Sequence, residues 1–294
     1  MAKKISFRYL IIGSNGLLGS KIKKNLPSKK TFCIARSFSD YNCDLLNLKK
    51  ILDLFNKYEF SNVINCAALA NIDKCEKNKI KCRKINLDFP IFLNSLSKKK
   101  KFNLILILTD QVYCKGNKKK YKETDKISFT NFYSKTKYLA EKHLIKNDKC
   151  LIIRTNFTGF KKNLKETFIG WILESLINKK KIKLYNDLYV STLDVNYCSK
   201  AIIKLINLNA KGVFNLGSNS SLSKEKFAFI FAKKLKKKLY YESVSSKRTS
   251  IFRPQNLTMD TKKIEKKVKV NMPNPRKVIN NLINETIIYE NFRN

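Results

Sequence analysis

The sequence has few of the residues that hold metals, and its cysteines are not arranged as a disulfide framework. It contains one histidine, His143, among 294 residues, and its eight cysteines are scattered with no CxxC pair. Zinc sites need clustered His and Cys ligands, and a disulfide framework needs regularly spaced cysteines in a short secreted chain. We therefore expect no metal site, buried free thiols and a reducing, cytoplasmic compartment.

Long apolar runs are also missing. No stretch approaches the roughly 18 apolar residues that cross a bilayer. The apolar segment near the N-terminus is too short for a secretory signal before Gly13 interrupts it. We expect no membrane span. The hydrophobic content of 43% and the length of the chain are instead typical of a globular protein with a large core.

Acidic residues are scarce: 22 Asp and Glu stand against 62 Lys and Arg, which gives a formal net charge of +40. Such an excess ordinarily suggests nucleic acid or an anionic membrane surface as a partner. All but eight of the basic residues are lysine, however, whereas arginine dominates base reading and bidentate phosphate recognition. We interpret the charge as a solvated lysine surface that attracts anions in general and expect no specific nucleic-acid partner. True polyanion binding is the alternative.

Short apolar runs alternate with amphipathic segments over the first two-thirds of the chain. This alternation is typical of βαβ units in a doubly wound α/β fold with a parallel sheet. The predicted strands cover residues 9–12, 31–35, 62–66, 104–108 and 151–154, and the predicted helices cover 20–25, 48–58, 79–98 and 134–145. Beyond these the pattern loosens into helices at 167–177, 195–206 and 222–236 and short strands at 182–184 and 213–216.

Glycine is scarce, yet three of the eight glycines lie within seven residues: Gly13, Gly16 and Gly19. They follow the first predicted strand and open the first helix, which is the place of a phosphate-binding loop. Such glycines permit the tight turn, the approach of backbone amides to a pyrophosphate, and close helix–strand packing. A plain strand-to-helix turn is the alternative. The other residues assigned to this cofactor loop are Asn15, Leu17 and Leu18.

Two further strand ends extend the predicted dinucleotide site. Arg36 follows the second strand, where an arginine accommodates a 2′-phosphate, so we expect NADPH with NADH as the alternative. Ala67, Ala68 and Leu69 follow the third strand. These residues would let the backbone pass under the cofactor, although they also suit close packing. We predict a Rossmann domain over residues 1–155 and a small α/β substrate-binding lobe over 156–294, with segments that return to the first domain.

A tyrosine four residues before a lysine can form an acid/base pair, and the chain has two such pairs: Tyr133 with Lys137 and Tyr138 with Lys142. Five residues turn a helix by roughly 500°, so the two tyrosines face different sides. Thr109 ends the fourth strand, where hydroxyls line the ligand crevice of parallel sheets. A lysine one turn away would lower the pKa of a tyrosine, which is otherwise near 10. The Thr109 hydroxyl would polarise a carbonyl, and Tyr133 would protonate the new alkoxide.

The chain resembles the dTDP-4-dehydrorhamnose reductase branch of the extended short-chain dehydrogenases/reductases nearly end to end. The segments that carry the resemblance include IIGSNGLLGSKI (11–22), VINCAALANIDKCE (63–76), ILTDQVYCKG (107–116), YSKTKYLAE (133–141), GVFNLGS (212–218) and RPQNLTMDTKKI (253–264). This family has a Ser or Thr at the fourth strand end about two dozen residues before its catalytic tyrosine. Thr109 precedes Tyr133 by 24 residues, so the resemblance identifies Thr109, Tyr133 and Lys137 as the catalytic residues.

The resemblance implies NADPH-dependent reduction of the C4 ketone of a nucleotide-linked 4-keto-6-deoxy sugar, in dTDP-L-rhamnose and surface polysaccharide biosynthesis. Lys137 would also hold the nicotinamide ribose, and a homodimer is compatible with this family. Phe157 stands where relatives often carry a tryptophan against the sugar, which leaves the exact sugar open. The further residues implied are Asp44 and Leu45 for the adenine, Asp110 for the substrate, and Arg253 for its pyrophosphate.

Other functions share much of this pattern. Nucleotide-sugar epimerases and dehydratases have the same glycine loop and Tyr/Lys pair, but a dehydratase usually has a glutamate where Gln111 follows Asp110. A catalytically silent NAD(P)-binding regulatory subunit is a third possibility, against which the complete catalytic set argues. Asp73 and Glu76 could bind a metal, but we interpret them as an acidic helix start.

Overall fold

The computed structural model describes residues 4–113, 119–248 and 254–291. Two compact units share these residues. Unit 1 comprises Met1–Val112, Asn131–Arg154 and Ser199–Phe214, and unit 2 comprises Tyr113–Thr130, Thr155–Cys198 and Asn215–Asn294. The chain passes between the two units at several points besides the one near residue 155. The division into domains 1–155 and 156–294 therefore stays a prediction.

Unit 1 is built on a seven-stranded sheet that confirms the predicted doubly wound α/β fold. Its strand order is β11-β6-β5-β4-β1-β2-β3, and the pairs from β3 to β5 are parallel. The strands are β1 (Ile5–Ile12), β2 (Thr31–Ala35), β3 (Tyr41–Asn42), β4 (Tyr58–Asn65), β5 (Asn103–Thr109), β6 (Cys150–Thr155) and β11 (Gly212–Leu216). The direction of winding reverses between β1 and β4, so a ligand crevice is expected at the carboxyl ends of these two strands.

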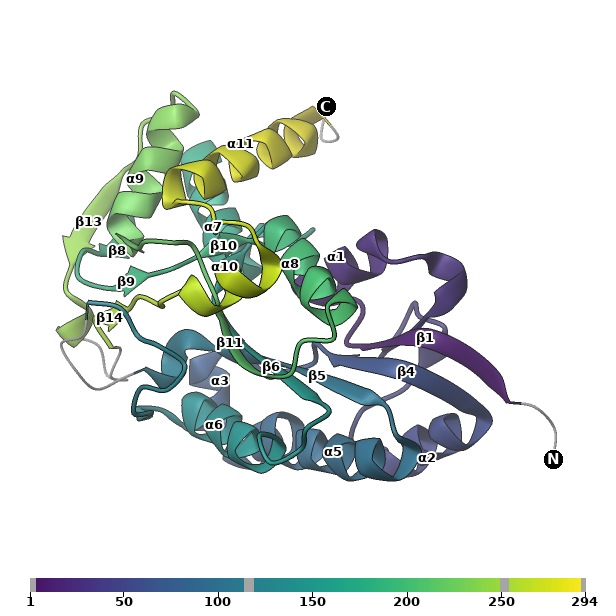
Figure 1. The fold of residues 1–294 in the computed structure, drawn as a ribbon. Coiled ribbons are helices and arrows are strands. Elements are labelled where there is room, and N and C mark those ends of the chain that lie inside the picture. Colours follow the sequence, from purple (N-terminus) through teal and green to yellow (C-terminus); the bar gives the residue numbers. More distant parts are fainter. Residues whose placement is uncertain (1–3, 114–118, 249–253, 292–294) are drawn as a thin grey trace. The chain divides into compact units, whose positions relative to one another are not determined.

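Helices cover both faces of this sheet (Figure 1). They are α1 (Leu17–Asn25), α2 (Leu48–Lys57), α3 (Ile72–Lys77), α4 (Lys79–Arg83), α5 (Phe89–Lys100), α6 (Phe132–Leu144) and α8 (Val195–Asn207). Helices α2, α5 and α6 lie on one face, and α1 and α8 lie on the other (Figure 1). The predicted helix at 79–98 is interrupted by a π turn, Lys84–Asp88. Pro90 follows this turn and has no amide to donate back into it, which explains the break.

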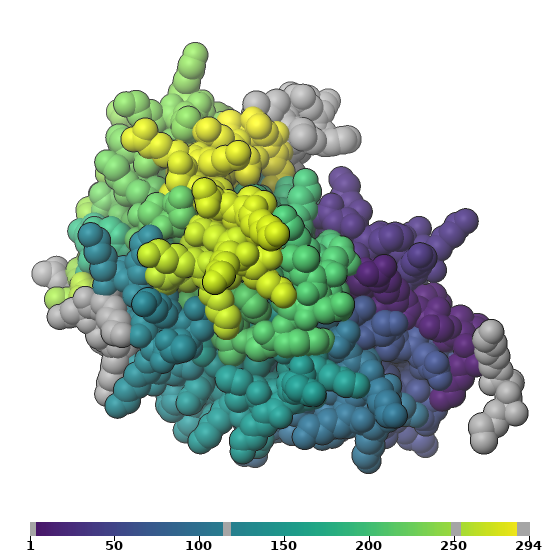
Figure 2. Space-filling model, viewed as in Figure 1, coloured from purple at the N-terminus to yellow at the C-terminus, as the bar shows by residue number. Residues whose placement is uncertain are grey.

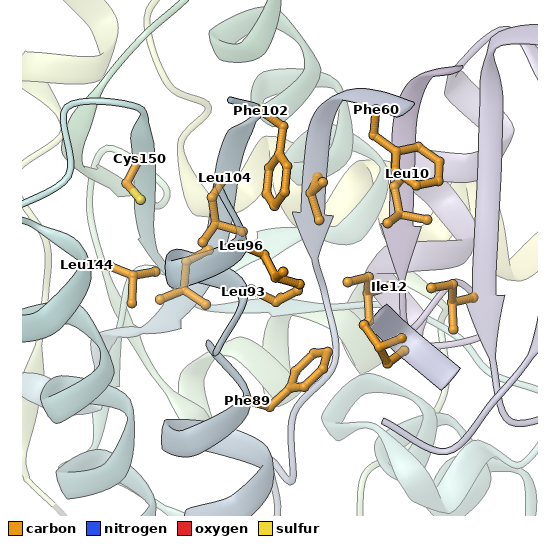
Figure 3. Close-up of a cluster of buried hydrophobic side chains, with 14 of the residues drawn as sticks. Leu10, Ile12, Phe60, Phe89, Leu93, Leu96, Phe102, Leu104, Leu144 and Cys150 are labelled. Carbon is orange, nitrogen blue, oxygen red and sulfur yellow. The ribbon is translucent and has the colours of Figure 1, made fainter. Parts of the chain in front are cut away.

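The main core of unit 1 lies between the sheet and α2, α5 and α6. Alternate strand residues such as Leu10 and Ile12 point into it, because successive side chains of a strand face opposite sides. Phe89 and Leu93 meet them from α5, as Figure 3 shows. These side chains are almost fully buried. The short apolar runs of the sequence thus became the inner strands of the sheet.

The free edge of the sheet at β2 is covered by side chains. Strand β3 has only two residues, which pair with Ile34 and Ala35. The amide of Cys33 donates instead to the Asp40 carboxylate at 2.8 Å. The amide of Ala35 donates to the Ser39 hydroxyl at 3.0 Å. The loop between β2 and β3 therefore acts as a substitute for a longer edge strand.

Unit 2 is a small α/β unit with three short sheets, as predicted for the C-terminal lobe. Its elements are β7 (Phe157–Thr158), α7 (Phe168–Ile177), β8 (Ile182–Tyr185), β9 (Tyr189–Val190), β10 (Leu193–Asp194), β12 (Leu222–Ser223), α9 (Lys224–Lys234), β13 (Tyr241–Val244), β14 (Asn256–Leu257), α10 (Lys262–Val268) and α11 (Pro275–Asn291). Residues of the last two helices, in yellow, lie at the surface in Figure 2. No helix in the described part of the chain combines the length and apolarity needed to cross a membrane.

Candidate active site

The glycine loop joins β1 to α1 in a conformation that side chains would prevent. Gly13 has a φ of +80°, and a Cβ there would lie 2.9 Å from the amide nitrogen of Ala67. A Cβ on Gly19 would collide with the carbonyl oxygen of Gly13. Gly13 is therefore required by the close approach of the segment after β4, and Gly19 is required by a close approach within the loop.

The start of α1 suits a phosphate. The helix begins at Leu17, and its N-cap residue Gly16 provides no side-chain cap for the first amides. No acidic side chain lies in the first turn. Amides at such a helix end carry partial positive charge and bind phosphate readily. The loop residues thus fit the pyrophosphate of a dinucleotide.

Two side chains predicted for the adenosine half of the cofactor, Arg36 and Asp44, are exposed. Arg36 directly follows β2 and is exposed. The Asn15 amide group donates to the Ser37 carbonyl at 2.5 Å, which ties this turn to the glycine loop. Asp44 is also exposed, and one of its carboxylate oxygens accepts the Leu46 amide at 2.9 Å. The neighbouring Leu45 packs against the main core.

The segment after β4 is held in place by an asparagine that the sequence did not identify. Asn86, in the π turn, accepts from the Leu69 amide at 2.9 Å and donates to the Leu69 carbonyl at 3.0 Å. The side chain is 1% exposed. Ala67 is half-buried, and Ala68 is exposed. Asn86 therefore fixes the predicted cofactor segment, residues 67–69, by bonding to both the amide and the carbonyl of Leu69.

Thr109, Tyr133 and Lys137 come together at the end of β5. The Thr109 hydroxyl lies close enough to the Tyr133 phenol to lower its pKa. Lys137 lies one turn after Tyr133 on α6, and its Nζ donates to the Ile107 carbonyl at 2.7 Å. Tyr133 and Lys137 are both buried, whereas Lys142 of the other pair is exposed. The first Tyr/Lys pair is thus the one that meets Thr109.

The protonation of this group differs from the prediction in one respect. Burial is the main cause that raises the pKa of Tyr133, and the negative charge of Asp110 raises it further. The pKa of Tyr133 is thus raised, whereas the sequence led us to expect a lowering by Lys137. The Lys137 ammonium group donates to the Ile107 carbonyl. Burial lowers the pKa of Lys137 to about 8.

Asp110 lies directly beside the hydroxyl pair. The Thr109 hydroxyl donates to an Asp110 carboxylate oxygen at 3.2 Å and accepts the Gln111 amide at 3.1 Å. Asp110 is 1% exposed, so its charge acts at short range and with little screening. The Thr109 hydroxyl has one proton, so it would turn from Asp110 toward a carbonyl oxygen placed beside it, and Tyr133 would donate the second hydrogen bond. This arrangement can polarise a ketone and deliver a proton to it.

A short helix, α3, begins where Asp73 and Glu76 were interpreted as an acidic helix start, and it supports the first turn of α6. Glu76 of α3 accepts the amide of Phe132 at 2.6 Å, and Asp73 lies in the first turn of α3. Cys75 and Cys82 are buried next to Tyr133. The carboxylate of Glu76 thus serves the start of α6, and Asp73 is the acidic residue in the first turn of α3.

Two predicted substrate residues lie in unit 2 or outside the described residues. Phe157 lies in β7 of unit 2 and is half-buried. Arg253 lies outside the described residues. Their assignments to the substrate therefore stay predictions from the resemblance.

Several known proteins with similar sequences or folds are named as reductases of sugar or glycan biosynthesis. A probable low-salt glycan biosynthesis reductase, Agl14 of Haloferax volcanii, is 23% identical over 230 residues, or 74% of this chain and 76% of that protein. A dTDP-4-dehydrorhamnose reductase of Aggregatibacter actinomycetemcomitans is 28% identical over 51% of each chain. The crystal structure of a dTDP-4-dehydrorhamnose reductase from Bacillus anthracis in complex with NADP has a TM-score of 0.86 at 21% identity. It matches 96% of this chain and 100% of that one.

The family match extends over nearly the whole sequence. The profile of the RmlD substrate binding domain matches residues 7–288, a range that includes the glycine loop, the strand end at Thr109 and the Tyr133–Lys137 pair. The chain therefore belongs to the RmlD substrate binding domain family.

Proposed function

We propose that this protein is an NADPH-dependent reductase of a nucleotide-linked sugar. The observation that carries the proposal is the meeting of Thr109, Tyr133 and Lys137 within the unit that also contains the glycine loop. The fit of the loop to a pyrophosphate and the exposed Arg36 next to it support NADPH as the cofactor. The relative from Bacillus anthracis, whose structure contains NADP, supports the same cofactor.

The residues divide the reduction of a ketone between them. The bound dinucleotide supplies the hydride. Thr109 donates a hydrogen bond to the carbonyl oxygen and so favours the negative charge that develops on it. Tyr133 transfers its phenolic proton to that oxygen and completes the alcohol. The raised pKa of Tyr133 suits this direction of reaction, because a proton donor must be protonated at neutral pH.

The substrate we propose is the C4 ketone of a 4-keto-6-deoxy sugar linked to dTDP, the substrate class that the names of several relatives indicate. Lys137 would hold the hydroxyls of the nicotinamide ribose. The lysine-rich surface would favour the approach of any doubly anionic nucleotide sugar. The destination of the product would be a surface polysaccharide, as the glycan-related names of the relatives suggest.

NADPH oxidation in the presence of dTDP-4-keto-L-rhamnose, with GDP- and UDP-linked 4-ketosugars in parallel, tests this proposal. We expect wild type to oxidise NADPH with at least one of these sugars and Tyr133→Phe to lose about 10²- to 10⁴-fold in kcat. Tyr138→Phe is the matched control, because Tyr138 has the same spacing to a lysine. Binding of NADPH without turnover by wild type would favour a regulatory subunit, and tightly bound, non-exchanging NAD would favour an epimerase.

A further inference from the structure

A buried ion pair fastens α6 to the sheet. Arg154, near the end of β6, donates from Nε to Oε2 of Glu141 at 2.9 Å, and its second nitrogen, Nη2, bonds to Oε1. Each side chain is nearly inaccessible, with an exposed fraction of 2%. Because guanidinium and carboxylate groups are both planar, this two-pronged contact fixes an angle as well as a distance.

The ion pair acts on the same side of α6 as the proposed proton donor. Tyr133, Lys137 and Glu141 follow one another at intervals of four residues, so they span roughly 80° of the helix circumference. Lys137 contacts β5 through the Ile107 carbonyl, and Glu141 contacts the neighbouring strand β6. Two polar contacts, one turn apart, therefore set the rotation of α6 about its axis.

Only one of these two contacts also belongs to the proposed chemistry. If Lys137 binds the ribose hydroxyls, its hold on the Ile107 carbonyl weakens. Glu141 lies eight residues from Tyr133, about 12 Å along the helix, and so acts through the helix rather than on the reacting atoms. The bond between Glu141 and Arg154 does not involve Lys137, so it does not depend on whether Lys137 binds the cofactor.

Resting on the proposed reductase function, we propose that Glu141 and Arg154 are positioning residues that hold the rotation of α6 at which the Tyr133 hydroxyl meets Thr109. A buried ion pair contributes little net stability compared with apolar residues of similar volume, whereas breaking one partner is strongly destabilising. A purely structural role and a positioning role can therefore be separated by replacing both charges together.

The test compares Glu141→Gln, Arg154→Lys and the double variant Glu141→Leu/Arg154→Met with wild type. Asp88→Asn is the control, because it removes an exposed ion pair of the same unit, in which Arg83 Nε lies 3.4 Å from Asp88 Oδ1. The measurements are kcat, the KM values for the ketosugar and for NADPH, and the thermal midpoint. All activities are measured well below the midpoint of each variant.

Both single variants are expected to lose about 10- to 100-fold in kcat, because a displacement of a reacting group by about 1 Å is enough for such a loss. KM for NADPH should rise by a smaller factor than kcat falls, since Lys137 moves with α6 while the glycine loop lies on other elements. The double variant should regain the thermal midpoint of wild type but not its kcat. Recovery of both, or wild-type kcat in the single variants, would overturn the proposal.

Crystal structures of wild type and the double variant provide a readout that needs no substrate. The Tyr133 hydroxyl should move away from Thr109 in the variant, and an unchanged separation of the two hydroxyls would again contradict a positioning role. A wild-type protein that turns over no ketosugar would refute the proposed function, while this structural comparison would still decide the role of Glu141 and Arg154.

Discussion

The hydroxyl of Thr109, at the tip of β5, lies next to the phenol of Tyr133 in the first turn of α6 and lowers its pKa. This proximity allows both hydroxyls to reach the oxygen of one substrate carbonyl. Thr109→Val removes one donor and keeps the shape, so kcat is expected to fall about 10²- to 10³-fold. Thr109→Ser keeps the hydroxyl and should retain most of the activity. Equal kcat values for the Val and Ser variants would exclude Thr109 from the reaction.

Arg36 should determine the choice between NADPH and NADH. A charge-assisted hydrogen bond contributes about 1.5–3 kcal/mol, so Arg36→Ala should raise KM for NADPH about 10- to 100-fold. KM for NADH should stay nearly constant, because NADH has no 2′-phosphate. Arg83→Ala, which removes another exposed arginine of the same unit, is the control. A parallel rise of both KM values in Arg36→Ala would argue against contact with the 2′-phosphate.

Asn86 is expected to support cofactor binding through the backbone of Leu69. Asn86→Leu leaves both backbone groups of Leu69 without this partner, and the free energy of unfolding should fall by about 2–4 kcal/mol. The Kd for NADPH should rise as well. The control is Asn94→Leu, which removes another buried hydrogen bond, that from Asn147 Nδ2 to Asn94 Oδ1 at 2.7 Å. It should lower stability but leave the Kd unchanged, and an equal rise in both variants would refute a local effect.

The buried ammonium group of Lys137 should make stability depend on pH. Its pKa is lowered from 10.5 to about 8 by burial, so the unfolded chain binds more protons at this site between these values. The site therefore destabilises the folded state below pH 8, and this penalty disappears as the pH rises to 10.5, by up to about 3 kcal/mol.

Urea denaturation of wild type and Lys137→Met at several pH values isolates this effect, because other titrating groups contribute equally to both proteins. The free energy of unfolding of the variant relative to wild type should decrease as the pH rises from 8 to 10.5. A difference that does not change with pH would mean that the pKa of Lys137 is not lowered.

The sheet of unit 1 was predictable because its signals are local. The run at residues 31–35 became β2 with the predicted bounds, and Thr109 ends β5 as expected. The three clustered glycines could be recognised from their spacing alone, although the close approach that requires Gly13 is to the distant residue Ala67. Apolar periodicity and glycine spacing thus sufficed to predict the fold and the position of the glycine loop.

The missed features depend on segments that are distant in sequence or weak in pattern. Nothing near Asn86 or Glu141 indicates that their partners are Leu69 and Arg154. The asparagine-rich helix α11 has low intrinsic helix propensity, and two-residue strands have no periodicity to detect. The pKa of Tyr133 also escaped prediction, because its burial arises only when α3, α4 and β5 pack around α6.

The side-chain cover on β2 bears on how this protein behaves at high concentration. A bare outer strand invites the strand of a second molecule, which is a common route to aggregates. Here two amides that such an intruder would need are already occupied by Asp40 and Ser39. Molecules that each carry a formal charge of +40 also repel one another. The occupied amides and this repulsion both oppose edge-to-edge association of the sheet.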